Sequence, residues 1–204
     1  VTTRYFSDEP VTDEQLQTAF NYARFAPQGG NRQPVRFIVV KDQEKRNQLA
    51  EWYRVPWKAY LADAQTGDID ISSDNTPLLL KTADHFADHL EEIPAMVVAC
   101  AHLEDTHPTD TELGRLSVVG GASIYPAVQN FILGCREAQL GASLTTLLCL
   151  FEPQVKELLG MPEDAATVAH IAVGHRTKAF PTKLDRMGLE EIVFSETWGE
   201  VTYS

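Results

Sequence analysis

Residues 26–34 read Ala-Pro-Gln-Gly-Gly-Asn-Arg-Gln-Pro, and they run directly into residues 35–40, Val-Arg-Phe-Ile-Val-Val. The prolines fix the backbone and remove amide donors, while the adjacent glycines permit positive φ and a close approach of another molecule. A capped turn needs only one glycine, so the loop is either such a turn or, with the amides of Asn31 and Gln33, a ligand-binding loop. The segment that follows predicts a strand, and its nearly continuous apolar end predicts burial on both faces.

The composition is that of a globular chain with an acidic surface. The 204 residues can bury a sizeable core, and we expect them to form a single domain, 1–204. The net charge of −12 disfavours nucleic acid and membrane surfaces as partners, because both attract basic proteins. Cys100, Cys135 and Cys149 lie in apolar surroundings, so we read them as core residues of a protein in a reducing compartment, the cytoplasm.

Hydrophobic periodicity predicts helices that alternate with strands, which indicates a three-layer mixed α/β or α+β domain. Thr12 and Gln15 form a capping box at the first helix, and Pro56 is expected to interrupt or kink the second. The tail beyond residue 175 has apolar residues but no partner of its own, so we expect it to wrap over another part of the molecule or over a second subunit. Helices are expected over 13–25, 41–61, 77–92, 120–138 and 153–159, strands over 35–40, 95–101 and 167–173, an extended stretch over 141–147 and a loop over 62–75.

Three familiar kinds of catalytic or binding site are disfavoured by the sequence. His85 and His89 share one helix face at a spacing that suits zinc, but the metalloprotease motif's Glu is replaced by Phe86 and no third ligand is evident, so we expect no metal site. Ser143 and His170 fit a hydrolase triad on paper, yet the nucleophile-elbow sequence G-x-S-x-G is absent. The glycine pairs also do not match the dinucleotide or P-loop fingerprints.

Cations occur near both ends of the chain, in segments without a clear helix or strand pattern. Arg4 lies near the start, and Lys183 and Arg186 lie near the end. These residues are either solvated charges or side chains that close together on one phosphate, which arginine binds through two oxygens.

Five segments, taken together and in order, resemble the FMN-dependent nitroreductase family, and the similarity covers nearly the whole chain. The resemblance implies an α+β fold with three α/β/α layers and a central mixed, mostly antiparallel sheet. It also implies a homodimer with FMN sites built by both subunits, and a domain-swapped C-terminal arm, 175–204, that wraps the partner. The matching segments are 4–11 (Arg-Tyr-Phe-Ser-Asp-Glu-Pro-Val), 26–34, 121–130 with its Gln129-Asn130, 139–146 (Gln-Leu-Gly-Ala-Ser-Leu-Thr-Thr) and 168–174 (Val-Ala-His-Ile-Ala-Val-Gly).

The resemblance implies which residues hold the FMN phosphate. Arg4 looks like the last basic residue of the family's N-terminal R-x-S-x-R motif, and Thr2 stands at the serine position with its hydroxyl kept. The first arginine of that motif would precede Val1. Lys183 and Arg186 are similar to the family's C-terminal basic pair on the phosphate.

The resemblance also implies which residues surround the flavin ring. Thr146 stands where the best-known branch has Glu, and Val35 stands where an aromatic residue is usual. The implied positions are Pro27, Gln28, Gly29 and Asn31 in the loop that reaches the partner's flavin, Gln33 near the ring edge, and Leu144, Thr145 and Thr146 against one ring face.

The implied activity is hydride transfer from NADH or NADPH to flavin N5, followed by reduction of a small acceptor such as a nitroaromatic or a quinone. The flavin carries the chemistry, so no catalytic side chain is named. Trp52, Tyr53 and Trp57 are either stacking platforms of an acceptor pocket, formed with the 62–75 loop, or core residues. The alternatives are a flavin carrier or sensor, a specialised biosynthetic flavin oxidase, and a structural dimer that has lost its cofactor.

Overall fold

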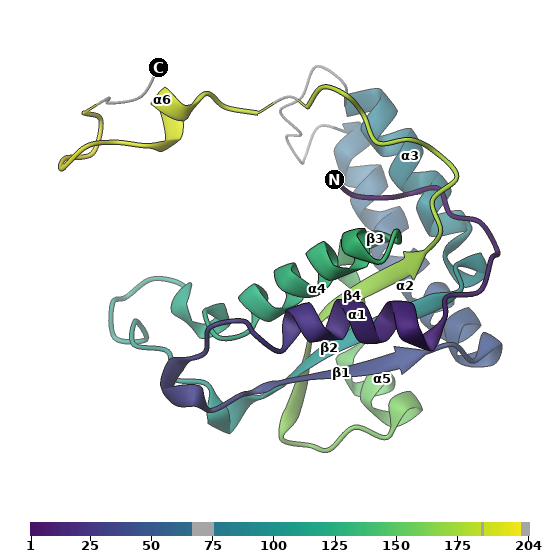
Figure 1. The fold of residues 1–204 in the computed structure, drawn as a ribbon, viewed down its shortest axis with the longest axis horizontal. Coiled ribbons are helices and arrows are strands. Elements are labelled where there is room, and N and C mark those ends of the chain that lie inside the picture. Colours follow the sequence, from purple (N-terminus) through teal and green to yellow (C-terminus); the bar gives the residue numbers. More distant parts are fainter. Residues whose placement is uncertain (67–75, 185, 201–204) are drawn as a thin grey trace.

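A four-stranded antiparallel sheet organises the fold, which is shown in Figure 1 as a computed structural model that describes residues 1–66, 76–184 and 186–200. The sheet order is β1-β2-β4-β3, and all three pairings between the described strands are antiparallel. The expected α+β class with a mostly antiparallel sheet is therefore confirmed. The strands are β1 (Val35–Val40), β2 (Ala95–His102), β3 (Gly141–Thr145) and β4 (Ala165–Gly174).

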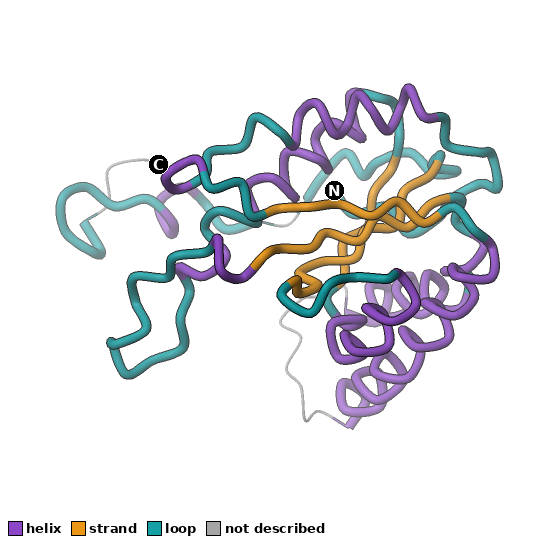
Figure 2. The backbone as a smooth tube through the Cα atoms, turned by 90° about the horizontal axis from the view of Figure 1, so that it is seen from below, coloured by secondary structure: helices purple, strands orange, loops and turns teal. Residues whose placement is uncertain are grey.

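Helices cover both faces of the sheet, and Figure 2 shows the strands between two helical layers. Helices α1 and α4 pack on one face, and α2, α3 and α5 pack on the other, so each layer encloses its own apolar core. The helices are α1 (Asp13–Ala23), α2 (Gln43–Thr66), α3 (Thr76–Asp88), α4 (Tyr125–Glu137), α5 (Glu152–Leu159) and α6 (Leu189–Ile192).

The predicted capping box begins α1. The backbone N–H of Gln15 donates to the Thr12 hydroxyl at 3.2 Å, and the Gln15 side-chain oxygen accepts from the Thr12 N–H at 3.1 Å. The helix then packs closely on α4, because Gly134 has no side chain: a Cβ at this position would lie 2.6 Å from the Ala19 Cα. Backbone-to-backbone contact of this kind fixes how α1 enters the loop of residues 26–34.

The strands differ in burial, and one expectation is wrong. Strands β2 and β4 are buried along nearly their whole length. Strand β1, expected to be buried on both faces, is an edge strand in which only Val40 is fully buried, and Val39 is 37% exposed. The reason is topological, because among the described strands β1 pairs with β2 alone and its outer side borders an open groove.

The helix boundaries also correct the expectations. Helix α2 continues past Pro56 to Thr66, so residues 62–66 are helical and not part of a loop, while residues 67–75 lie outside the described residues. Tyr53 and Trp57 are buried on either side of the proline, and this tertiary packing holds the helix where local propensity would break it. Helix α4 starts at Tyr125, not at 120, and its first turn contains Pro126, where a missing N–H is harmless.

His170 lies on β4, on the side of the sheet that α2 covers, and it is fully buried. Neither ring nitrogen has a hydrogen-bond partner among the described residues, and burial lowers the pKa of the imidazole to about 4. Ser143 is also buried, which disfavours the hydrolase alternative.

The cysteines are free thiols. Cys100 and Cys135 are core residues as expected, whereas Cys149 is half-buried. Cys100 and Cys135 are buried, and burial raises the pKa of each thiol to about 12. Within the described ranges, no helix has the length and apolarity that a membrane crossing requires.

Acidification is expected to destabilise the fold through His170. The unfolded imidazole titrates near pH 6.5 and the folded one near 4, so the unfolded chain binds more protons between these values. Stability therefore falls as the pH drops from 6.5 to 4, by on the order of 3 kcal/mol. His170→Leu should reduce this loss in urea unfolding measured at pH 7 and 4.5, whereas His107→Leu, on an exposed loop, should not. An equal loss in both variants would contradict the role of His170.

Candidate functional site

The predicted site residues fall into two groups at opposite ends of the sheet. Val35 pairs with Ala101 at one end, where the loop of residues 26–34 enters β1. Gly141 pairs with Gly174 at the other end, where the N-terminal residues lie. The chain therefore brings together Thr2, Arg4, Leu144 and Thr145. It holds the loop residues Pro27, Gln28, Gly29, Asn31 and Gln33 apart from them.

The N-terminal arm, residues 1–10, docks on the sheet through its backbone. An isolated bridge between Phe6 and Arg176 continues the antiparallel pairing beyond β4. The arm is thus an ordered extension of the sheet, which fixes the place of Arg4. The hydrogen bonds join Thr3 N to Ala142 O at 2.9 Å, Ser7 N to His175 O at 2.8 Å and Thr177 N to Tyr5 O at 3.1 Å.

Two paired glycines make room for this arm. A Cβ on Gly141 would lie 2.5 Å from the Thr3 hydroxyl, and a Cβ on Gly174 would lie 3.1 Å from the Phe6 ring. Since Gly141 and Gly174 are opposite each other in the β3–β4 ladder, the missing side chains form one continuous slot. The slot explains why glycine stands at both positions although neither has a positive φ.

Arg4 is a half-buried cation with no hydrogen bond or ion pair to the described part of the chain. Burial lowers the pKa of its guanidinium, and the nearby Tyr53 phenol offsets this only in part. Arginine remains charged in spite of such a shift. A desolvated charge without a partner indicates a place where an anionic group of another molecule would be stabilised.

Arg4 borders a hollow of 260 Å³ between α2 and the end of β3. Tyr53, Trp57 and Tyr60 line one side, and Leu144 and Thr145 line the other. Burial raises the pKa of the Tyr53 phenol, and a hydrogen bond with the Thr145 side chain lowers it by less. Tyr53 and Trp57 are thus core residues that also line the hollow. The half-buried Trp52 stacks on Phe151. Thr146 is exposed just beyond this strand.

The loop of residues 26–34 has an unusual backbone. Gly30, Asn31 and Gln33 all have positive φ, at 59°, 52° and 54°. Glycine adopts this conformation freely and asparagine tolerates it, but a glutamine there is strained by roughly 1–3 kcal/mol. The N–H of Gly29 donates to the Ser123 hydroxyl at 3.0 Å, which ties the loop to the start of α4. Strain retained on a tied loop is typical of functional segments.

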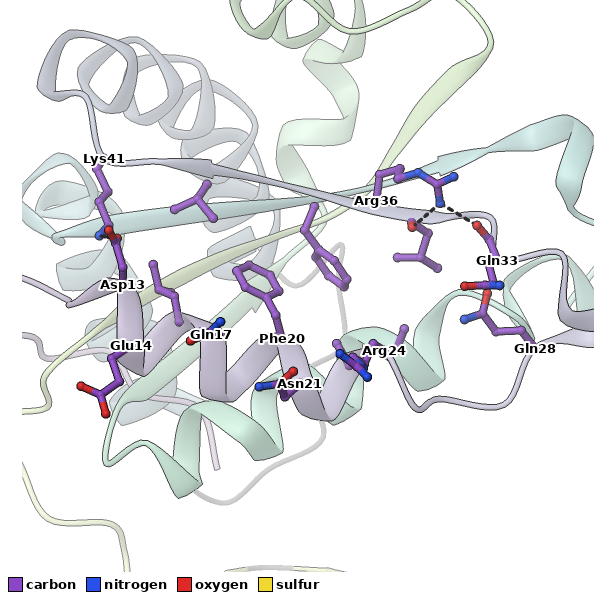
Figure 3. Close-up of a pocket in the computed structure, with 16 residues that line it drawn as sticks. Asp13, Glu14, Gln17, Phe20, Asn21, Arg24, Gln28, Gln33, Arg36 and Lys41 are labelled. Carbon is purple, nitrogen blue, oxygen red and sulfur yellow. Dashed lines mark hydrogen bonds and ion pairs between the residues drawn. The ribbon is translucent and has the colours of Figure 1, made fainter.

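Gln28 and Gln33 point toward each other at the end of a groove of 920 Å³ between α1 and β1, shown in Figure 3. The Gln28 side-chain oxygen is buried and has no hydrogen-bond partner among the described residues. Phe20 and Phe37 form the apolar floor of the groove. Its charged rim consists of Asp13, Glu14, Arg24, Arg36 and Lys41.

A further hollow of 520 Å³ lies between this loop and the segment of residues 105–123. That segment has no regular secondary structure over most of its length, but the buried Asp110 organises it. Its carboxylate accepts from the Ser117 hydroxyl at 2.6 Å, from Arg115 at 2.8 Å and from the Val118 N–H at 2.9 Å. These hydrogen bonds lower the pKa of Asp110 to about 2, and the bond from Ser117 has the largest effect. Sequence reasoning missed Asp110, because only the folded loop brings its donors together.

The predicted role of the C-terminal cations on the phosphate stays a prediction. Lys183 and Arg186 are exposed in the segment that leaves the body of the protein, and neither lines the hollows at Arg4 among the described residues. Lys178, which sequence reasoning missed, does line one of them. The ring centres of His85 and His89 lie 4.1 Å apart with the rings tilted by 39°, and among the described residues no third candidate ligand joins them to form a metal centre.

Comparisons with known proteins support the fold and identify the family. The fold is that of a class of solved oxidoreductases: an NADPH:FMN oxidoreductase from Vibrio harveyi, solved with NAD+, superimposes with a TM-score of 0.69 at 23% identity, over 99% of this chain and 76% of that one. The model of the nitroreductase family matches residues 1–175. The chain therefore belongs to the nitroreductase family.

Curated relatives share modest sequence identity with the chain. A Streptomyces coelicolor protein named for NADH dehydrogenase or NAD(P)H nitroreductase activity is 27% identical over 194 residues, 94% of this chain and 89% of its own. The NADPH-flavin oxidoreductase of Vibrio harveyi is 26% identical over 176 residues, 84% of this chain. The chain spans less than two thirds of some relatives, 60% of the Vibrio harveyi protein and 66% of one from Streptomyces griseus.

A methyl group at Gly141 is expected to release the N-terminal arm. In Gly141→Ala the new Cβ would overlap Thr3, so Thr3 must move and the trypsin site after Arg4 becomes accessible. Limited trypsin digestion followed by mass spectrometry should show faster cleavage there than in the parent protein. Gly120→Ala, whose Cβ would meet nothing closer than 3.7 Å, serves as the control. Adding Thr3→Gly should restore protection, and a double variant that is cut as fast as Gly141→Ala would contradict the slot.

Proposed function

We propose that the protein is an FMN-dependent oxidoreductase that takes hydride from NADH or NADPH and reduces a small aromatic acceptor, such as a nitroaromatic or a quinone. The observation that carries the proposal is the unpartnered, half-buried Arg4 beside Leu144 and Thr145. A cation that lacks a partner, next to a hollow with aromatic and hydroxyl walls, suits a flat ring that carries an anionic tail. When bound, FMN would supply the hydride chemistry, and the protein would supply binding and orientation.

The residues present fit this cofactor from both ends of the sheet. Arg4 and Thr2 would hold its anionic part, and Leu144, Thr145 and Thr146 would face the ring. The buried amide oxygen of Gln28 lacks a partner in the described chain, so it remains available to a donor on the ring edge. A role of Lys183 and Arg186 on the phosphate remains a prediction, because their positions in the described chain do not support it.

We infer that each site needs two copies of the chain, because Arg4 and the loop of residues 26–34 lie at opposite ends of one sheet. The C-terminal arm of one copy would then lie in the α1–β1 groove of the other. The arm extends away from the body (Figure 1) and exposes Leu189, Ile192 and Trp198. Its acidic side chains, Glu190, Glu191, Glu196 and Glu200, complement the rim residues Arg24 and Arg36, whereas the rim residue Lys41 is already paired with Asp13.

FMN binding and its reduction test the proposed activity. We expect the purified chain to bind FMN. We also expect NADH or NADPH to bleach the bound flavin rapidly in the absence of oxygen. Arg4→Ala should weaken FMN binding by about 10- to 100-fold, since a hydrogen bond to a charged group contributes roughly 1.5–3 kcal/mol. Lys45→Ala, an exposed cation at the start of α2, should not change the affinity measured by fluorescence titration. Binding without bleaching would identify a flavin carrier or sensor instead, and no binding would exclude both.

A heterodimer tests the shared site. Arg4→Glu removes the cation, and Gly29→Trp blocks the loop of residues 26–34, so either homodimer should bind no FMN. Co-expressed with different tags, the two variants form a heterodimer in which one site carries both changes and the other carries neither. We expect one FMN per purified heterodimer by absorbance. If each site belonged to one protomer, the heterodimer would bind none.

A further inference from the structure

Lys178 shares with Arg4 a second hollow, of 200 Å³, where the N-terminal arm meets the segment after β4. Hydroxyls of Thr2, Thr3 and Thr82 also line it. No carboxylate is among the described residues of its wall, in a chain with 29 acidic and 17 basic residues. A pair of cations with hydroxyls and no acid is the donor set that a phosphate monoester requires.

An aromatic stack holds Lys178 in place. Its ammonium nitrogen lies 3.1 Å from the centre of the Tyr5 ring, and the Tyr5 ring stacks on His85 at 4.5 Å with an interplanar angle of 25°. Tyr5 therefore contacts both the Lys178 ammonium and the His85 ring. His85 in turn contacts His89 on the next turn of α3. The ammonium has no ion pair among the described residues, so its hydrogen-bond donors remain available.

Two more cations support this corner of the molecule. The guanidinium groups of Arg136 and Arg176 lie 4.5 and 4.6 Å from the centre of the Phe180 ring, which lines the same hollow. Positive charge from α4, the N-terminal arm and the segment after β4 therefore converges here, on a protein whose net charge is −12. Such a local field favours a doubly charged anion over a neutral ligand.

We propose that Lys178, together with Arg4, binds the phosphate of the flavin nucleotide, and that Tyr5 positions Lys178. This inference rests on the proposed function. It assigns the role of second phosphate-binding cation to Lys178 in place of Lys183 and Arg186. Arg4 lines both hollows, so it stands where the ring of a bound flavin would pass into its phosphate-bearing tail.

Comparing FMN with riboflavin, which lacks the phosphate, tests the assignment on the full chain freed of flavin. Lys178→Met should weaken FMN binding by about 10- to 100-fold and leave riboflavin binding unchanged. The control Lys45→Met, which changes an exposed cation at the start of α2, should change neither. Unaltered FMN binding in Lys178→Met, or an equal loss of FMN and riboflavin, would overturn the proposal.

Variants of Tyr5 test the positioning role. Tyr5→Phe keeps the ring and should bind FMN as the parent does, whereas Tyr5→Leu removes the cation–π contact and should resemble Lys178→Met. A Tyr5→Leu variant with parental affinity for FMN would refute the positioning.

Inorganic phosphate separates this proposal from the proposed function. If the parent binds neither flavin, the oxidoreductase assignment fails, and calorimetry with phosphate still decides the role of Lys178. Binding by the parent and loss in Lys178→Met would support the site, and no phosphate binding by such a parent would refute it.

Discussion

The N-terminal arm can lie against the sheet only because Gly141 and Gly174 have no side chains. These residues face each other across β3 and β4, so the slot that they leave is as regular as the ladder itself. The arm enters the slot and continues the pairing, which brings a cation from near the start of the chain to the end of β3. The position of Arg4 therefore depends on the absence of side chains at these two glycines.

Local signals explain the part of the fold that the sequence predicts well. The capping box at Thr12 and the buried strands β2 and β4 have patterns complete within about ten residues, and the structure confirms them. The same reasoning fails where distant residues decide. Pro56 predicts a break in α2, but buried aromatic residues on both sides keep the helix intact. The apolar run of β1 predicts burial, but its position at the sheet edge cannot be read from the run itself.

The residues of the candidate site also differ in how far local sequence predicts them. The loop of residues 26–34 is recognisable from its composition, because prolines, glycines and amides in this order have local consequences. Lys178 is not recognisable, because its role depends on Tyr5 and His85, which come from two other segments. Asp110 is a similar case: an ordinary acidic residue in the sequence becomes the centre of a loop only when Ser117 and Val118 fold back onto it.

The open edge of β1 has a consequence for the newly made chain. Its sequence, Val-Arg-Phe-Ile-Val-Val, combines high strand propensity with a single charge, and its outer backbone groups have no strand partner among the described residues. Such an edge is a template on which other extended chains add and aggregate. Arg36 interrupts the run and so protects it in the manner of a gatekeeper residue. The charge on Arg36 therefore limits the association of newly made chains through this strand edge.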